Sequence, residues 1–323
     1  MLAIHRMSQP VNMASATSSA ATTDLEPTHS TRGVPAVSIV VPCYNGGRFL
    51  DGLMAALDRQ TFRDFEVIII DDGSTDDLTA RKLAELKDCV RVIRQPNGGL
   101  PAARNAGARA ARAGIVFMHD CDDTIEPTYL AETVRALQSA PSDVAIAFSH
   151  TRLVGGRSGI VTYYFNRFDL LFGNVIGAGL MVRKECWRAV GGYDETMRDG
   201  YEDWDFNLRL VEAGFRGIEI AKPLFNYRVA NVNQTPSMMS VIHNQGLYAE
   251  LWRKLRERHP KTYNLPAIIG AWWTTRHERG SIPLWKGLGG YILAITLPDA
   301  AFNRLFVKFH RHRRRMLPGA LQT

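Results

Sequence analysis

Short apolar runs alternate with amphipathic segments from residue 37 to residue 118. Four apolar runs have the length of a strand: 37–41, 65–70, 90–93 and 115–118. Three segments between them repeat apolar side chains at helical spacing: 49–57, 78–86 and 101–113. Continuous apolar strands separated by helices of about 10–15 residues are typical of βαβ units, whose parallel strands are buried on both faces. The pattern therefore predicts an α/β fold with a Rossmann-like, doubly wound, mostly parallel sheet.

Beyond residue 140 the pattern is less regular. It predicts a strand at 144–148, a glycine-rich loop region at 155–179 and a helix around 203–213. A short strand at 217–220 is expected to close the domain. Chemistry that depends on the loop region therefore cannot be derived from periodicity alone.

The two ends of the chain differ from its middle. Residues 1–35 are rich in Ser, Thr and Ala and lack the apolar core of a secretory signal, so they are predicted to be a disordered leader. Residues 236–323 are predicted to be a basic, aromatic, helical extension, which leaves 36–235 as the α/β domain. Within 282–309 the longest nearly unbroken apolar run, 288–297, is about half of the ~20 residues that a membrane span needs. A hairpin or helix lying on a membrane surface is the expectation for this stretch.

The distribution of charge separates the extension from the rest of the chain. The net charge of the 323 residues is +7, yet residues 251–323 alone hold 14 Lys and Arg against 3 Asp and Glu. Residues 1–250 are therefore slightly acidic. A nucleic-acid enzyme would be expected to place positive charge on its working face, so nucleic acid is excluded as a partner. The extension is predicted to bind an anionic membrane surface.

The cysteines indicate the compartment. Four cysteines, at positions 43, 89, 121 and 186, form no CxxC pair and are too few for a disulfide scaffold. A reducing cytoplasm is the expectation, with the protein peripheral on the inner face of the cytoplasmic membrane through its basic extension.

Polar groups follow three of the predicted strands. Tyr44 and Asn45 follow the first, Asp71 and Asp72 the second, and the run 120–123 the fourth. Open α/β sheets bind ligands outside the carboxyl ends of their strands. We therefore expect these groups to converge on one crevice.

The run Asp120-Cys121-Asp122-Asp123 is the strongest chemical signal. Three carboxylates within four residues repel one another unless a cation is present, and carboxylate oxygens suit Mg²⁺ or Mn²⁺ bridging to a diphosphate. A structural alternative remains, in which Asp123 or Thr124 caps a helix that Pro127 helps to start.

The other groups also have structural explanations. Ser74 or Asp76 could cap the helix after the second strand, and 44–46 is a turn signal. Arg104 follows a glycine-bearing loop at 97–99, a placement that suits phosphate oxygens. An arginine on a solvated helix face is the commoner outcome for such a residue.

A second acidic cluster opens the predicted helix at residue 203. Glu202, Asp203 and Asp205 would favour the dipole of that helix in its first turn. A carboxylate shielded by Trp204 could instead act as a general base toward an acceptor hydroxyl. Both interpretations stay open at this point.

Several motifs are missing. The chain has no GxxxxGK[ST], no GxGxxG after the first strand, no GxSxG and no HExxH. A phosphate-loop NTPase, a common nicotinamide dehydrogenase, an α/β-hydrolase and a zincin therefore lose support.

Taken together, six blocks in order resemble glycosyltransferase family 2 with the GT-A fold. They are VSIVVPCYNGG, QTFRDFEVIIIDDGSTDD, NGGLPAARNAG, FMHDCDD, GGYDETMRDGYEDWDFNLRL and PLFNYRV, and they span about residues 37–229. The resemblance implies an inverting, metal-dependent enzyme. Such an enzyme moves one sugar from a nucleotide-diphosphate sugar, here expected to be a UDP-sugar, to a hydroxyl of a glycan or lipid-linked acceptor. Assembly of a bacterial surface polysaccharide or glycolipid is the implied role.

The resemblance also implies roles for individual residues. Six match nucleotide-binding positions: Pro42, Tyr44, Asn45, Asp72, Arg104 and Asp120. Mn²⁺ or Mg²⁺ would be bound by Asp122, with Asp120 and Asp123 beside it. Asp203 matches the catalytic base, and Glu202 would help to orient the acceptor.

Departures from the family pattern limit the interpretation. Processive synthases of the family carry QxxRW and several membrane spans, and this sequence has neither, so one sugar per encounter is expected. Two alternatives remain: an inactive nucleotide-sugar-binding protein and a sugar nucleotidyltransferase.

Overall fold

The first four strands and the helices between them form a parallel βαβ arrangement. The computed structural model describes residues 33–230, 248–278, 282–298, 300–302 and 304–305. The strands are β1 (Val37–Cys43), β2 (Phe65–Asp71), β3 (Arg91–Arg94) and β4 (Ile115–Met118). The helices are α1 (Gly47–Asp58), α2 (Asp77–Leu86) and α3 (Leu100–Ala110). The strand order is β3-β2-β1-β4, and each neighbouring pair is parallel, as predicted.

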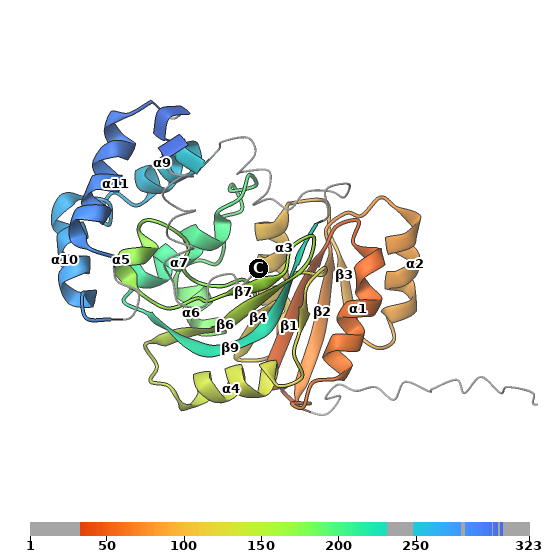
Figure 1. Ribbon diagram of the computed structural model, residues 1–323. Coiled ribbons are helices and arrows are strands. Elements are labelled where there is room, and N and C mark those ends of the chain that lie inside the picture. The colour runs from red at the N-terminus through yellow and green to blue at the C-terminus, as the bar shows by residue number, and fades with distance from the viewer. Residues whose placement is uncertain (1–32, 231–247, 279–281, 299, 303, 306–323) are drawn as a thin grey trace, which may run out of the picture.

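Both faces of this part of the sheet are covered, which explains the continuous apolar runs. Alternate residues of β1 enter two separate cores. Val40 packs in the core that contains Ala103 and Ala108 of α3. Ile39 packs in the other core, with Leu50 of α1. Figure 1 shows α1 and α2 on the face opposite α3.

The second half of the sheet is mixed rather than parallel. Its strands are β5 (Thr124–Ile125), β6 (Val144–Gly155), β7 (Gly159–Val161), β8 (Leu180–Arg183) and β9 (Arg216–Val229). The full order is β3-β2-β1-β4-β8-β6-β9-β5, with β7 paired to β6. β8 is antiparallel to both β4 and β6, whereas β6 and β9 are parallel. The predicted α/β fold is confirmed, but its parallel arrangement holds only for the first half of the sheet.

The differences from the predicted elements have local causes. β8, which directly follows the glycine-rich loop region, was not predicted. β9 has 14 residues, whereas four were predicted. The prediction was too short because Lys222 and Pro223 interrupt the apolar pattern of the strand, and because its pairing with β6 shifts register. The loop region 155–179 also contains β7 and a short helix, α5 (Arg167–Leu170).

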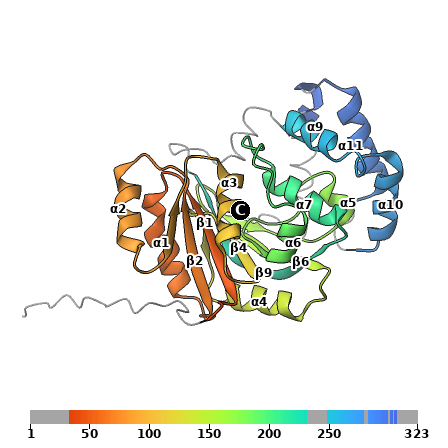
Figure 2. The ribbon, with the colours of Figure 1, turned by 180° about the vertical axis from the view of Figure 1, so that it is seen from behind.

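The remaining helices include the predicted helical C-terminal region. They are α4 (Tyr129–Ser139), α6 (Lys184–Ala189), α7 (Glu202–Glu212), α9 (Tyr248–Arg258), α10 (Leu265–Thr275) and α11 (Leu284–Thr296). The last three lie together at one end of the molecule, away from β2 and β3, in both views (Figures 1 and 2). Among the residues that the structure describes, no helix has both the length and the apolar character needed to cross a bilayer.

The C-terminal helices pack on the segment around α5 and share a core with α7. Trp252 of α9 donates a hydrogen bond from Nε1 to the carbonyl of Leu171 at 3.0 Å. Gly287 of α11 lies so close to Phe168 that an added Cβ would come within 2.5 Å of its ring. The predicted boundary between residues 235 and 236 falls outside the described residues, as does the basic run at 310–315.

A buried histidine fastens α9 to α7. His259 follows α9, and its two ring nitrogens lie 3.0 Å from Oδ1 of Asp205 and 3.0 Å from Oε1 of Glu212. Burial alone would lower the pKa of His259, but the hydrogen bonds and charges of the two carboxylates raise it to about 9. The imidazolium form therefore holds the C-terminal helices against the helix that carries the second acidic cluster.

This contact predicts a pH-dependent stability. The pKa of His259 is about 9 in the folded chain and 6.5 ordinarily, so its contribution is complete below pH 6.5 and is lost as the pH rises through 9. A shift of this size corresponds to about 3 kcal/mol. We expect His259→Gln to lower the free energy of unfolding at pH 6. Above pH 9 the free energy of unfolding of the variant should approach that of the parent protein. Denaturant titrations from pH 6 to 10 measure this, and a difference that does not change with pH would contradict it.

Candidate active site

The loops after β1 and β2 are tied to each other. Asn45 has a left-handed backbone conformation (φ 52°). Its Oδ1 accepts hydrogen bonds from the backbone N–H of Thr75 at 2.8 Å and of Asp76 at 3.3 Å. Its own N–H donates to Oγ of Ser74 at 3.0 Å. The predicted convergence of these two strand ends is therefore present, and Asn45 contributes to it as a structural link.

Asp72 fixes the loop that leads into α3. One carboxylate oxygen accepts from Nε2 of Gln95 at 2.7 Å and from the N–H of Gly98 at 2.9 Å, and the other accepts from the N–H of Gly99 at 2.8 Å. Only 3 % of Asp72 is exposed. Both oxygens are thus engaged with protein donors at the position that the resemblance assigns to a base contact.

Tyr44 is a predicted nucleotide-binding residue that is exposed to solvent. Its exposed fraction is 52 %, and it stands directly after the buried strand β1. Pro42 lies within β1, paired with Ile70 of β2. A ring placed in this way can stack on a planar base, whereas Pro42 shapes the strand beneath it.

The helix after β2 begins with an N-cap that the sequence predicts. Asp76 is the N-cap of α2, and its side chain accepts from the N–H of Thr79 at 2.8 Å. The neighbouring Asp71 accepts from the N–H of Ser74 at 2.9 Å and forms an ion pair with Arg94 at 2.7 Å. The acidic residues after β2 therefore organise the loop.

The three carboxylates after β4 point to different partners. Asp120 accepts from Arg104 at 3.0 and 3.2 Å. Asp122 forms an ion pair with Arg228 of β9 at 2.6 Å. Asp123 is buried, and its Oδ1 accepts from the N–H of Arg228 at 2.8 Å. Its Oδ2 has no hydrogen-bond partner among the residues that the structure describes.

One alternative for this run is wrong. Neither Asp123 nor Thr124 caps a helix, because Thr124 begins β5 and α4 has Thr128 as its N-cap. Asp123 is buried whereas Asp120 and Asp122 are partly exposed, so Asp123 is the least accessible of the three predicted metal ligands. Burial, with the charges of Asp122 and Asp120, raises the pKa of Asp123 well above its usual range.

Asp120 and Asp122 could supply some of the ligands of a divalent cation. Within the described ranges no group of three or more His, Cys, Asp or Glu side chains could hold a metal ion. The side chains of Asp120 and Asp122 are 30 % and 31 % exposed, so both reach the surface of the crevice. Mg²⁺ is usually bound through one or two carboxylates together with substrate phosphates. Two oxygen ligands therefore suffice if the substrate supplies the rest.

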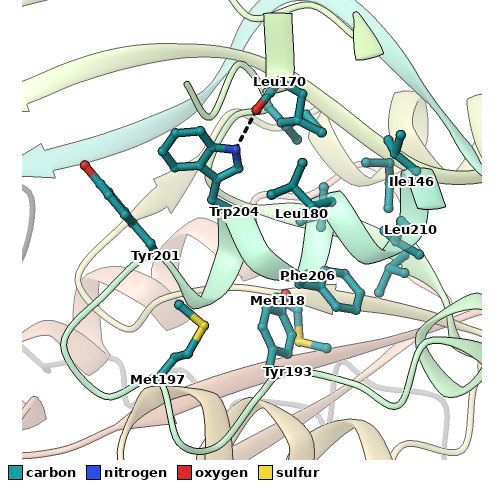
Figure 3. Close-up of a cluster of buried hydrophobic side chains, with 14 of the residues drawn as sticks. Met118, Ile146, Leu170, Leu180, Tyr193, Met197, Tyr201, Trp204, Phe206 and Leu210 are labelled. Carbon is teal, nitrogen blue, oxygen red and sulfur yellow. Dashed lines mark hydrogen bonds between the residues drawn. The ribbon is translucent and has the colours of Figure 1, made fainter. Parts of the chain in front are cut away.

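The second acidic cluster opens α7. Tyr201, the N-cap, has a left-handed backbone (φ 65°), and Glu202 is the first helical residue. Trp204 is almost fully buried, and its Nε1 donates to the carbonyl of Leu170 at 2.6 Å. Figure 3 shows this contact inside a cluster that also contains Phe206. The first turn of α7 is thereby anchored in the core.

Asp203 is held by two donors. Its Oδ1 accepts from the N–H of Trp204 at 2.7 Å, and its Oδ2 accepts from Nδ2 of Asn174 at 2.9 Å. Oδ1 of Asn174 in turn accepts from Nδ2 of Asn207 at 3.2 Å. Burial raises the pKa of Asp203, against the opposing charge of Arg104. The carboxylate is therefore oriented and made more basic than a solvated aspartate.

Arg104 links the two acidic clusters. One of its terminal nitrogens lies 2.7 Å from Glu202, and the other binds Asp120. Its Nε has no hydrogen-bond partner among the described residues, so the contact of Arg104 with phosphate oxygens stays a prediction. Burial also raises the pKa of Glu202 to about 7, although the charge of Arg104 opposes the shift.

Two residues of the site were not identified from the sequence. Arg228 occurs in the block PLFNYRV, but nothing in that block indicates that it pairs with Asp122 across the chain. Asn174 lies in the glycine-rich region without periodic pattern, so its contact with Asp203 depends on tertiary structure alone.

The comparisons with known proteins agree with this fold. Residues 38–174 match the family model described as glycosyl transferase family 2. A hyaluronan synthase from Pasteurella multocida is 28 % identical over 197 residues, which are 59 % of this chain and 20 % of that protein. S. aureus TarS 1-349 in complex with UDP-GlcNAc matches with a TM-score of 0.53 and 18 % identity, over 86 % of this chain and 87 % of that one.

A third similar protein is the mannosyltransferase PcManGT from Pyrobaculum calidifontis, whose structure is in complex with GDP-Man and Mn²⁺. It matches with a TM-score of 0.51 and 18 % identity, over 85 % of each chain. The chain spans 27 %, 20 % and 30 % of the first three curated relatives that it matches. The predicted resemblance is confirmed: residues 38–174 match glycosyltransferase family 2, and the fold is of the GT-A type.

Proposed function

We propose that this chain transfers one sugar from a nucleotide-diphosphate sugar to an acceptor hydroxyl with inversion at the anomeric carbon. The observation that carries the proposal is the placement of Asp203. Its carboxylate is oriented by Asn174 and by the first turn of α7, and Arg104 connects its neighbour Glu202 to Asp120. The Arg104 side chain thus bridges the start of α7, which carries the basic carboxylate of Asp203, and the run 120–123, which is expected to face the diphosphate.

The reaction follows from these positions. Asp203 would take the proton of the acceptor hydroxyl as its oxygen attacks the anomeric carbon from the face opposite the leaving nucleotide. A raised pKa makes a carboxylate a stronger base near neutral pH. Asn174 leaves one oxygen of Asp203 in a fixed direction, so the acceptor meets a preorganised base. One direct displacement inverts the configuration and needs no covalent intermediate.

On the donor side, Tyr44 would stack on the base, and the loop fixed by Asp72 would border the nucleotide. Asp122 and Asp120 would hold Mn²⁺ or Mg²⁺. When bound, such an ion stabilises the charge that grows on the diphosphate. Arg228 balances the charge of Asp122 in the structure described here. UDP in the S. aureus TarS complex supports a UDP-sugar donor. GDP-Man in the PcManGT complex supports a GDP-sugar instead, so both bases are to be tested.

The first prediction for this function concerns Asp203. Asp203→Asn keeps the size of the side chain but cannot accept a proton, so turnover should fall by about 10²- to 10⁴-fold. Nucleotide affinity should change little, because other residues carry it. Asp205→Asn is the matched control: Asp205 lies in the same helical turn but binds Arg209 and His259. The control should lose stability while turnover per folded molecule stays near normal. Equal turnover in both variants would refute a catalytic role for Asp203.

The reaction products distinguish the transferase from its two alternatives. A glycosyltransferase releases a nucleoside diphosphate from the sugar nucleotide, whereas a sugar nucleotidyltransferase forms or consumes pyrophosphate. An inactive binding protein releases neither. Incubation with a panel of UDP- and GDP-sugars, with and without added pyrophosphate, followed by chromatography of the nucleotides, separates the three. Only a nucleotidyltransferase releases a nucleoside triphosphate when pyrophosphate is added.

Metal dependence is the second prediction. Asp122→Asn removes the charge that would bind the cation, and we expect both this variant and chelation with EDTA to abolish sugar transfer. Asp143→Asn is the control, since Asp143 forms an exposed ion pair with Arg216 rather than with a residue of the proposed metal site. Full turnover in excess EDTA, with no retained metal in elemental analysis, would overturn the assignment.

We further propose that the C-terminal helices hold the enzyme on an anionic membrane surface at the cytoplasmic face, where a lipid-linked or growing glycan acceptor would be available. The outward sides of α10 and α11 expose large apolar residues: Leu265, Ile269, Trp273, Trp285, Ile292 and Ile295. The guanidinium of Arg276 lies 3.9 Å from the ring centre of Trp273. Residues 300–323 contain six Lys and Arg and no Asp or Glu. This combination suits a helix pair that lies in a lipid interface.

This face yields the third prediction for the function. Deleting α11 would uncover Phe168, so point variants are the cleaner test. Trp285→Glu together with Ile292→Glu should weaken co-sedimentation with vesicles that contain phosphatidylglycerol, while sugar transfer to a water-soluble acceptor is retained. Leu78→Glu, on α2 at the other end of the molecule, is the control and should bind as the parent does. Equal binding of the parent to neutral and anionic vesicles would refute the electrostatic part.

A further inference from the structure

Two cysteines lie side by side at the ends of neighbouring strands. Cys43 is the last residue of β1, and Cys121 stands three residues beyond the end of β4. The two strands are parallel neighbours in which Val40 pairs with Met118. Each cysteine lies three residues beyond that pair, so the register places the two at the same level. Adjacent strands are about 4.7–4.9 Å apart, which lies within the Cα separation that a disulfide requires.

Their side chains face each other. Each thiol acts on the other: the contact with Cys121 lowers the pKa of Cys43, and the contact with Cys43 raises the pKa of Cys121. Both sulfurs also lie under the backbone of Gly46: a Cβ added there would be 2.7 Å from Sγ of Cys121 and 3.2 Å from Sγ of Cys43. Cys43 is buried and Cys121 is half-buried, so Cys121 is the member of the pair that has surface exposed to solvent. All four cysteines of the chain are free thiols in this structure.

The pair connects two segments of the proposed donor site, although the proposed reaction uses neither thiol. Cys43 immediately precedes Tyr44, and Cys121 stands between Asp120 and Asp122. A covalent bond between the sulfurs would therefore join the turn that follows β1 to the acidic run that follows β4. The other two cysteines, Cys89 and Cys186, belong to other parts of the fold.

We propose that Cys43 and Cys121 form a modification site, a dithiol that a peroxide converts to a disulfide and that a thiol reductant restores. In the first step one of the two thiols is oxidised to a sulfenic acid while hydrogen peroxide is reduced to water. In the second step the other thiol attacks the sulfenic sulfur, the S–S bond forms and a second water leaves. The bond draws the two sulfurs together to covalent distance and pulls the flanking residues with them.

The consequence for donor binding rests on the proposed function. Drawing the sulfurs together moves Tyr44 relative to Asp120 and Asp122, which that function assigns to the base and to the diphosphate. Binding sites lose affinity when their groups leave the bound geometry, so we expect the oxidised protein to bind UDP at least about tenfold more weakly than the reduced protein. Reduction with dithiothreitol should restore the affinity.

The formation of the disulfide is tested without any assay of activity. The full chain carrying Cys89→Ser and Cys186→Ser retains only the pair. After treatment with hydrogen peroxide its intact mass should fall by two hydrogen atoms, and peptide mapping should find Cys43 joined to Cys121. Adding Cys43→Ser to this background should prevent the mass loss and leave Cys121 as an oxygenated thiol. A pair that stays reduced, or that gains oxygen instead of losing hydrogen, overturns the proposal.

The coupling to the site is tested by calorimetry of UDP with Mn²⁺ on the reduced, oxidised and re-reduced forms. Weaker binding by the oxidised form alone, reversed by dithiothreitol, supports the coupling. Equal affinity in all three forms refutes the coupling. Failure of the reduced form to bind UDP or GDP counts against the proposed function, while the disulfide is still decided by the mass measurement.

Discussion

The buried ion pairs of Arg104 are the interaction on which the site depends. A guanidinium without bulk water must be matched by negative charge. Here Asp120 supplies it from 16 residues along the chain and Glu202 from 98 residues along the chain. Removing one partner of such a network leaves an uncompensated buried charge, which is strongly unfavourable. The relative position of the two acidic clusters is therefore maintained by electrostatics, and α3 acts as the support between them.

Two further residues give the carboxylates of the site different partners. Arg228 neutralises Asp122 from β9, the strand that sequence patterns underestimated in length. Asn174 donates to Asp203 from the loop before β8. Like charges this close raise one another's pKa, and Arg228 opposes this effect at Asp122. The mixed half of the sheet thus supplies the partners for the acidic residues that the parallel half and α7 present.

The C-terminal helices complete the same core rather than adding a separate one. Trp252 and Ile268 pack in the cluster that contains Trp204, and His259 bridges to the helix that carries Asp203. The opposite faces of these helices remain apolar and exposed. One set of helices can therefore both stabilise the catalytic helix and offer a surface for a lipid interface.

The sequence alone determined the class of fold and the positions of the acidic clusters, because burial on both faces leaves continuous apolar strands and because ligands collect at strand ends. Local patterns also predicted the N-cap Asp76 and the helix that begins near Asp203. Only the tertiary structure decided the direction of each carboxylate. Asp123 turned inward and Arg104 met two acids, since the partner of a side chain depends on segments brought close by folding. Charge pairing over long sequence separations carries no periodic signal in the chain.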